Sequence, residues 1–151
     1  MGLREDAGRI VREAIGSVLP GPAVMRAVQD MRFAPEGRVI LIAVGKAAWD
    51  MAASALKVLP VPADSGVVIT KYGHARGPLK NIEIREAGHP VPDENGYRAT
   101  ARALELVKGL SAGDTVLFLL SGGGSALFEA PLVSPEEMTL SPRLLSRLNF
   151  K

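Results

Sequence analysis

The chain has 151 residues and no cysteine, so disulfide bonds, thiolate metal ligands and a cysteine nucleophile are all excluded. It also lacks a run of about 18 consecutive apolar residues, which a membrane-spanning helix requires. Near the start, Arg4, Glu5, Asp6 and Arg9 interrupt any apolar core of a secretion signal. These absences together predict a cytoplasmic protein that does not bind membranes.

Concentrated positive charge is missing as well. The formal net charge is only +2, and acidic residues separate basic ones such as Lys80, Arg85 and Arg98. Aromatic residues are few and scattered: one Trp, two Tyr and four Phe. A nucleic-acid surface needs a basic stripe and often aromatic side chains for stacking. We therefore expect no nucleic-acid partner.

Apolar residues are abundant, at 47% of the chain, and a single domain of this length buries about 68–70% of its unfolded surface. Residues 39–44 form an unbroken apolar run, which is typical of a strand buried on both faces of a parallel sheet. Further strands are predicted at 66–70, 82–87 and 114–120, and the strand at 82–87 is expected to lie nearer an edge. Helices are predicted at 3–18, 22–31, 47–58 and 97–108. The alternation predicts an α/β fold, a three-layer α/β/α sandwich with a mostly parallel, Rossmann-like sheet.

Small, polar and cationic residues follow every predicted strand. In an open parallel sheet, ligands bind at the carboxyl ends of the strands. The residues at these ends are Gly45 and Lys46, then Thr70 to His74, then Gly88 and His89, and finally Ser121 to Ser125. Their convergence predicts a ligand site at this edge of the sheet.

The loop after the last strand is Ser121-Gly122-Gly123-Gly124-Ser125. Three consecutive glycines let the backbone adopt positive φ and approach a ligand closely. If a helix begins at Ser125 or Ala126, its N–H groups and dipole favour an anion, and the two hydroxyls add donors. The spacing matches neither the Walker loop nor G-x-G-x-x-G. We predict a site for phosphate or a similar anion; the alternative is a tight turn needed only for strand–helix packing.

Three further kinds of residue are candidates for chemistry. Lys46, at the start of a helix, either neutralises a phosphate or developing negative charge, or simply reaches water. Lys71 and His74 flank Gly73 and either bind a carboxylate or phosphate or belong to a solvated loop. His89 is a substrate donor, an acid–base group or part of a turn before a proline. No metal-ligating cluster is predicted, because no second carboxylate pairs in sequence with Glu129, the acidic residue that follows the glycine loop.

Four segments together resemble the N-terminal domain of the glycerate 2-kinases, a family whose C-terminal half carries the MOFRL domain. The segments are Ala43–Ala48, Val68–His74, Glu86–Asp93 and Leu120–Leu127. They occur in the family's order and cover the chain from roughly residue 5 to residue 140. Each segment is weak alone, whereas the four in sequence are specific.

This resemblance implies ATP-dependent phosphorylation of D-glycerate to 2-phosphoglycerate, with Mg²⁺ accompanying the nucleotide. It implies an active site between two domains, with Lys46 as a catalytic residue and the loop from Ser121 to Ser125 in contact with phosphate. Phosphoryl transfer depends chiefly on positioning and charge neutralisation, which a lysine and a glycine loop can supply.

The chain is much shorter than members of this family, and the resemblance fades from about Ser141. We expect residues 1–140 to be a truncated N-terminal domain, 141–151 to be a divergent tail, and the MOFRL domain to be absent. Such a chain is expected to be inactive alone and to pair with the missing domain or with itself. Two alternatives stay open: a hydroxypyruvate reductase, and a non-catalytic domain that binds anions or sugar phosphates.

Overall fold

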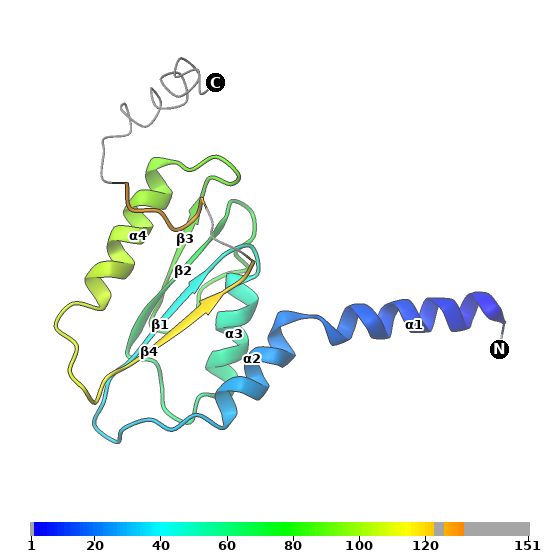
Figure 1. Cartoon of the computed structure of the whole chain (residues 1–151), viewed down its shortest axis with the longest axis horizontal. Helices are drawn as coiled ribbons and strands as arrows, with labels where there is room; N and C mark the ends of the chain where they lie inside the picture. The colour runs from blue at the N-terminus through cyan, green and yellow to red at the C-terminus, as the bar shows by residue number, and fades with distance from the viewer. Residues whose placement is uncertain (1, 123–125, 132–151) are drawn as a thin grey trace, which may run out of the picture.

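The computed structural model describes residues 2–122 and 126–131. Four helices and four strands lie along these residues (Figure 1). The elements in order are α1 (Leu3–Ser17), α2 (Pro20–Gln29), β1 (Val39–Val44), α3 (Ala48–Val58), β2 (Ser65–Lys71), β3 (Ile82–Ala87), α4 (Glu94–Leu106) and β4 (Thr115–Leu120). Every predicted element is present, with ends that differ by only a few residues.

The four strands form one sheet in the order β3-β2-β1-β4, and every pairing is parallel. All six residues of β1 are buried, as expected for a central strand covered on both faces. The expectation that the strand at 82–87 lies near an edge is confirmed, because β3 is at one end of the strand order. Parallel pairing brings the carboxyl ends of all four strands to one edge of the sheet.

Two apolar clusters hold the layers together, one on each face of the sheet. On one face, alanines of α3 and two valines of α2 pack against Leu41, Ala43 and Val68. On the other, Ala99 and Ala103 of α4 pack against alternate residues of β1 and β2. Alanine side chains let these helices lie close to the sheet. The predicted α/β class, with helices on both faces of a parallel sheet, is therefore confirmed.

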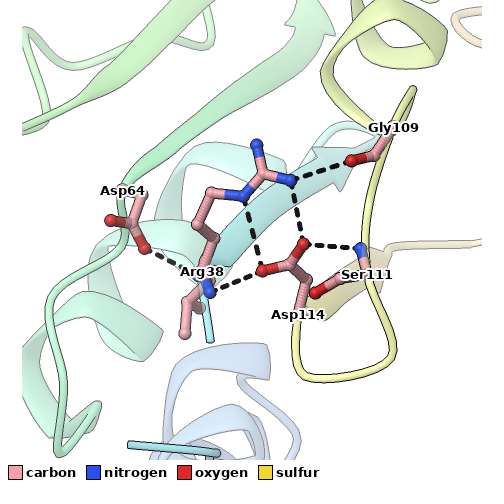
Figure 2. Close-up of polar contacts among 6 residues, drawn as sticks. Arg38, Asp64, Gly109, Ser111 and Asp114 are labelled. Carbon is pink, nitrogen blue, oxygen red and sulfur yellow. Dashed lines mark hydrogen bonds and ion pairs between the residues drawn. The ribbon is translucent and has the colours of Figure 1, made fainter. Parts of the chain in front are cut away.

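The amino edge of the sheet is fixed by a dense polar cluster (Figure 2). The Asp114 carboxylate accepts hydrogen bonds from the Arg38 guanidinium (2.8 Å), the Arg38 backbone N–H (2.8 Å) and the Ser111 backbone N–H (2.7 Å). Hydrogen bonds from the Arg38 side chain, with those from the two backbone N–H groups, hold the pKa of Asp114 far below its ordinary value. A second carboxylate, that of Asp64, accepts from the Val39 N–H at 2.7 Å. This cluster joins the starts of β1 and β4 to the turn before β4.

Two apolar surfaces stay largely exposed among the described residues. Helix α1 projects away from the sheet (Figure 1) and has no buried residue, although its apolar side chains follow helical spacing. On β4, Val116, Phe118 and Leu120 point to the face that carries α4 and stay 40–46% exposed. No helix among the described residues is long and apolar enough to cross a membrane.

Candidate functional site at the carboxyl edge

The ends of β1 and β4 meet in a tight backbone contact. Gly45 has a φ of +112°, and a Cβ at this position would overlap the carbonyl and hydroxyl oxygens of Ser121. The Ser121 N–H donates to the Val44 carbonyl (2.9 Å), and the Ser121 hydroxyl accepts from the Ala47 N–H (3.1 Å). Glycine is required at position 45 because it alone tolerates both this φ and this contact.

Lys46 lies between this contact and the first turn of α3. Its side chain is exposed, and no ion pair joins it to a carboxylate within the described part of the chain. The amino end of α3, which carries partial positive charge, begins two residues later. Two sources of positive potential therefore lie side by side, which suits an anionic ligand.

His74 is held beside Lys46 by the loop between β2 and β3 (residues 72–81). Its Nδ1 lies 3.1 Å from the Lys46 carbonyl oxygen. The same loop is tied to α3 by the Trp49 indole N–H, which donates to the Gly77 carbonyl at 2.9 Å, and by an ion pair between Arg76 and Asp50 at 2.9 Å. These contacts bring residues from the ends of two neighbouring strands to one place.

His89 lies half-buried in a second loop, which is organised by Asp93. The Asp93 carboxylate caps α4 by accepting a hydrogen bond from the Gly96 N–H (3.0 Å), and it accepts a second one from the Tyr72 hydroxyl (2.6 Å). Burial raises the pKa of Asp93, but hydrogen bonds from Tyr72 and from backbone N–H groups, that of Gly88 among them, outweigh burial and lower it. The hydrogen bond to Asp93 raises the pKa of the Tyr72 phenol. Asp93 thus connects the end of β2 with both ends of the loop that carries His89.

The structure joins some of the residues predicted from the sequence and leaves others apart. Lys46 contacts His74, and Ser121 contacts the backbone around Gly45. Lys71 ends β2 and is half-buried, and His89 follows β3; both lie at the carboxyl edge, without a described contact to Lys46.

The glycine loop is only partly visible. Gly122 has a φ of +87°, in agreement with a loop that needs glycine, while Gly123, Gly124 and Ser125 lie outside the described residues. Residues 126–131 form a turn and an irregular segment, so no helix begins at Ala126. The predicted contact between this loop and phosphate stays a prediction, and the Ser121 hydroxyl already has an internal partner.

Sequence reasoning missed the residues that position these loops. Tyr72 and Asp93 are 21 residues apart, and Trp49 and Gly77 are 28 apart, so no local pattern links them. Asp93 caps α4 through a local contact with Gly96, but its bond to Tyr72 depends on the pairing of β2 with β3. The described residues contain no group of three or more His, Cys, Asp or Glu side chains that could hold a metal ion.

Comparison with known proteins defines the class. Residues 6–148 match the family described as a domain of unknown function, DUF4147. The chain belongs to this family, which forms the N-terminal domain of glycerate 2-kinases.

Individual relatives carry more specific names than the family does. The chain is 54% identical to a D-glycerate 2-kinase of Thermotoga maritima over 90% of this chain and 32% of the relative. The crystal structure of the glycerate kinase from that organism superposes with a TM-score of 0.83, covering 95% of this chain and 35% of that one. A glycerate 2-kinase of Pyrococcus horikoshii is 40% identical over the whole chain and 36% of its own length. A putative hydroxypyruvate reductase of Agrobacterium vitis is 42% identical over 93% of this chain and 30% of its own length. The chain thus spans about a third of the length of these relatives.

Proposed function

We propose that this chain supplies one wall of a glycerate 2-kinase active site, which transfers phosphate from ATP to D-glycerate and yields 2-phosphoglycerate. The observation that carries the proposal is the exposed Lys46 at the amino end of α3, next to His74, in a chain 54% identical to a D-glycerate 2-kinase. A cation without a carboxylate partner is suited to neutralise charge that develops on a transferred phosphoryl group.

The residues at this edge fit the phosphates of a nucleotide. Lys46 supplies a full charge, and the amino end of α3 adds partial positive charge beside it. Mg²⁺ typically binds through phosphates and one or two carboxylates rather than through a protein cage. We therefore assign Mg²⁺ to the nucleotide. When bound, ATP supplies the phosphoryl group, and the chain's own residues orient it and balance its charge.

The proposed layout is an N-terminal domain over residues 1–140 and a divergent tail over 141–151, in the cytoplasm. Relatives are about three times as long, so the opposite wall of the site is assigned to polypeptide that this chain does not contain. Lys71, His74 and His89 are assigned to D-glycerate, and the loop Ser121–Ser125 to phosphate. On this basis the chain alone binds ATP but turns over D-glycerate slowly or not at all.

Ligand binding tests the proposal directly, by thermal unfolding of the purified chain with ATP and Mg²⁺, NADH or a sugar phosphate. We expect ATP with Mg²⁺ to raise the unfolding midpoint, since a ligand that binds only the folded state stabilises it. Stabilisation by NADH alone would favour the reductase alternative, which the Agrobacterium vitis relative keeps open. Stabilisation by sugar phosphates alone would favour a non-catalytic binding domain. Robust turnover of D-glycerate with ATP would contradict inactivity of the isolated chain.

The role of Lys46 has its own test. Lys46→Ala is expected to abolish the ATP-dependent rise in unfolding midpoint and to lower any turnover by roughly 100-fold. Without ligand, the unfolding midpoint is expected to stay unchanged, because the side chain has no described partner to lose. Lys57→Ala removes the same charge from the far end of α3 and is the matched control. Equal ATP binding by both variants would refute the role of Lys46.

A further inference from the structure

The backbone around His74 is fixed on both sides of the residue. Its own N–H donates to the Lys71 carbonyl at 3.0 Å, and the next N–H, that of Ala75, donates to the Glu86 carboxylate at 2.9 Å. Gly73, with a φ of +76°, allows the turn between Lys71 and His74. The imidazole is therefore presented from a defined position although its surface is exposed.

The ring is fixed as well, and its contact determines which nitrogen carries a proton. Nδ1 lies 3.1 Å from the Lys46 carbonyl oxygen. A carbonyl oxygen only accepts hydrogen bonds, so Nδ1 must be the donor. In the neutral ring the other nitrogen, Nε2, then has a lone pair. Nε2 is thus the nitrogen with capacity to accept a proton, on a ring joined to the residue that bears the exposed ammonium group.

We propose that Nε2 of His74 accepts the proton of the substrate hydroxyl in the reaction proposed above, on which this inference rests. The hydroxyl oxygen of D-glycerate forms a bond to the γ-phosphorus of ATP, and the bond from that phosphorus to the β,γ-bridging oxygen breaks. ADP leaves with the bond electrons, and the hydroxyl proton passes to Nε2, which makes the ring an imidazolium. Lys46 neutralises charge on the phosphoryl oxygens during transfer.

The ring is not needed to hold the loop in place. Trp49, Arg76 and Glu86 tie residues 75–77 to α3 and β3 without it. If the imidazole served only to hold the loop, it would duplicate the role of these three contacts. The Lys46 carbonyl orients the ring in the way that a carboxylate or carbonyl orients a catalytic histidine, by holding one nitrogen as a donor.

Asparagine separates the two roles of the ring. In His74→Asn the side-chain NH₂ occupies nearly the position of Nδ1 and can still donate to the Lys46 carbonyl, whereas Nε2 is lost. His74→Ala loses both. We expect the unfolding midpoint of His74→Asn to lie within about 2 °C of the unsubstituted chain, because the contact is retained. D-glycerate binding is expected to weaken roughly tenfold in both variants, while ATP still stabilises them.

Imidazole nitrogen NMR reads the geometry without relying on activity. The chain has only two histidines, so spectra of His89→Asn assign the signals of His74. We expect His74 to carry its proton on Nδ1 and its Nε2 signal to shift when D-glycerate is added with ATP and Mg²⁺. A proton on Nε2 alone, or D-glycerate binding that is unchanged in His74→Asn, overturns the role of His74 while ATP binding upholds the proposed function. If neither ATP nor D-glycerate binds, the proposed function is wrong, and the proton transfer to His74, which depends on it, is wrong as well.

Discussion

The two edges of the same sheet use polar residues in opposite ways. At the amino edge, the carboxylate oxygens of Asp114 and Asp64 accept hydrogen bonds from within the chain, from the Arg38 guanidinium and from backbone N–H groups (Figure 2). At the carboxyl edge, Lys46 and the Nε2 of His74 have no described partner, and the backbone beneath them is held tightly. One edge binds the fold together, and the other leaves a cation and a ring nitrogen without a partner among the described residues.

The contrast follows from where each charge gains its stabilisation. The Asp114 side chain is only 5% exposed, so its charge must be satisfied within the protein. Lys46 is exposed, so water satisfies its charge. Substitutions at the amino edge should therefore change stability, whereas substitutions of the outward-facing groups should change binding. The predictions below test this division between stability and binding. The first concerns Gly45, which lies at the carboxyl edge but is also needed for folding.

The largest effect is expected at Gly45. Gly45→Ala places a Cβ against the two Ser121 oxygens and forces an alanine into a φ of +112°. The steric overlap and the backbone strain each oppose folding. We expect the free energy of unfolding, measured with urea, to fall by about 3–5 kcal/mol. Gly73→Ala is the control, because its φ is also positive but no atom lies within 4 Å of the added Cβ. That variant should lose only about 1–2 kcal/mol; equal losses would show that φ alone, and not the contact with Ser121, requires glycine at position 45.

Asp114→Asn is expected to be the next most damaging change. It replaces a carboxylate that accepts from the Arg38 guanidinium and from two backbone N–H groups, and it removes the ion-pair partner of Arg38, which keeps only its hydrogen bond to the Gly109 carbonyl. Loss of charge-assisted hydrogen bonds at a nearly unexposed position should lower the thermal unfolding midpoint by roughly 10 °C. Asp64→Asn removes the charge of an exposed residue that accepts one backbone hydrogen bond and should lower the midpoint far less. A larger loss at Asp64 would mean that the cluster is centred elsewhere.

Acid should weaken the amino edge selectively. An aspartate in the unfolded chain titrates near pH 3.9, and Asp114 in the folded protein titrates well below that value. Its stabilising contribution is therefore complete above about pH 5 and is lost as pH falls through the unfolded pKa toward the folded one. We expect the unfolding midpoint between pH 7 and pH 2 to fall less steeply in Asp114→Asn. Some dependence should persist, because the pKa of Asp93 is lowered too. Identical slopes in the variant and the unsubstituted chain would argue against Asp114 as the main source.

The smallest effect concerns Ser121, a residue with both an internal and a proposed external role. Ser121→Ala removes the acceptor of the Ala47 N–H just before α3, and the free energy of unfolding should fall by roughly 1 kcal/mol. Ser17→Ala removes an exposed hydroxyl that bonds a carbonyl within α1 and should change this energy by less than about 0.5 kcal/mol. A negligible loss at Ser121 would free its hydroxyl for the phosphate role predicted from the sequence.

Much of the fold was predictable because it depends on local patterns. The apolar run at 39–44 identified the central strand, and the mixed pattern at 82–87 identified an edge. Helix α4 begins three residues earlier than the predicted Tyr97, because Asp93 caps it and Glu94 continues the first turn. These features need only neighbours in sequence.

The candidate site was predictable only as a set of strand ends. Strand order tells which ends meet, but the bond between His74 and the Lys46 carbonyl joins residues 28 apart and depends on how the loop folds over α3. The cluster at the amino edge joins Arg38 to Asp114 across 76 residues. Such contacts follow from the three-dimensional register of the strands, which no periodicity in the sequence encodes.

The strand order also dictates how this sheet can grow. The step from β1 to β2 and the step from β3 to β4 run in opposite directions, and their helices, α3 and α4, lie on opposite faces, as right-handed crossovers require. A fifth parallel strand beside β4 would continue in the direction of the second step. Its connecting helix would then cross the α4 face, over Val116, Phe118 and Leu120. Phe128 already packs edge-on against Phe118 there, with ring centres 5.5 Å apart. Right-handed growth of the sheet beside β4 would thus bury the exposed apolar strip on that strand.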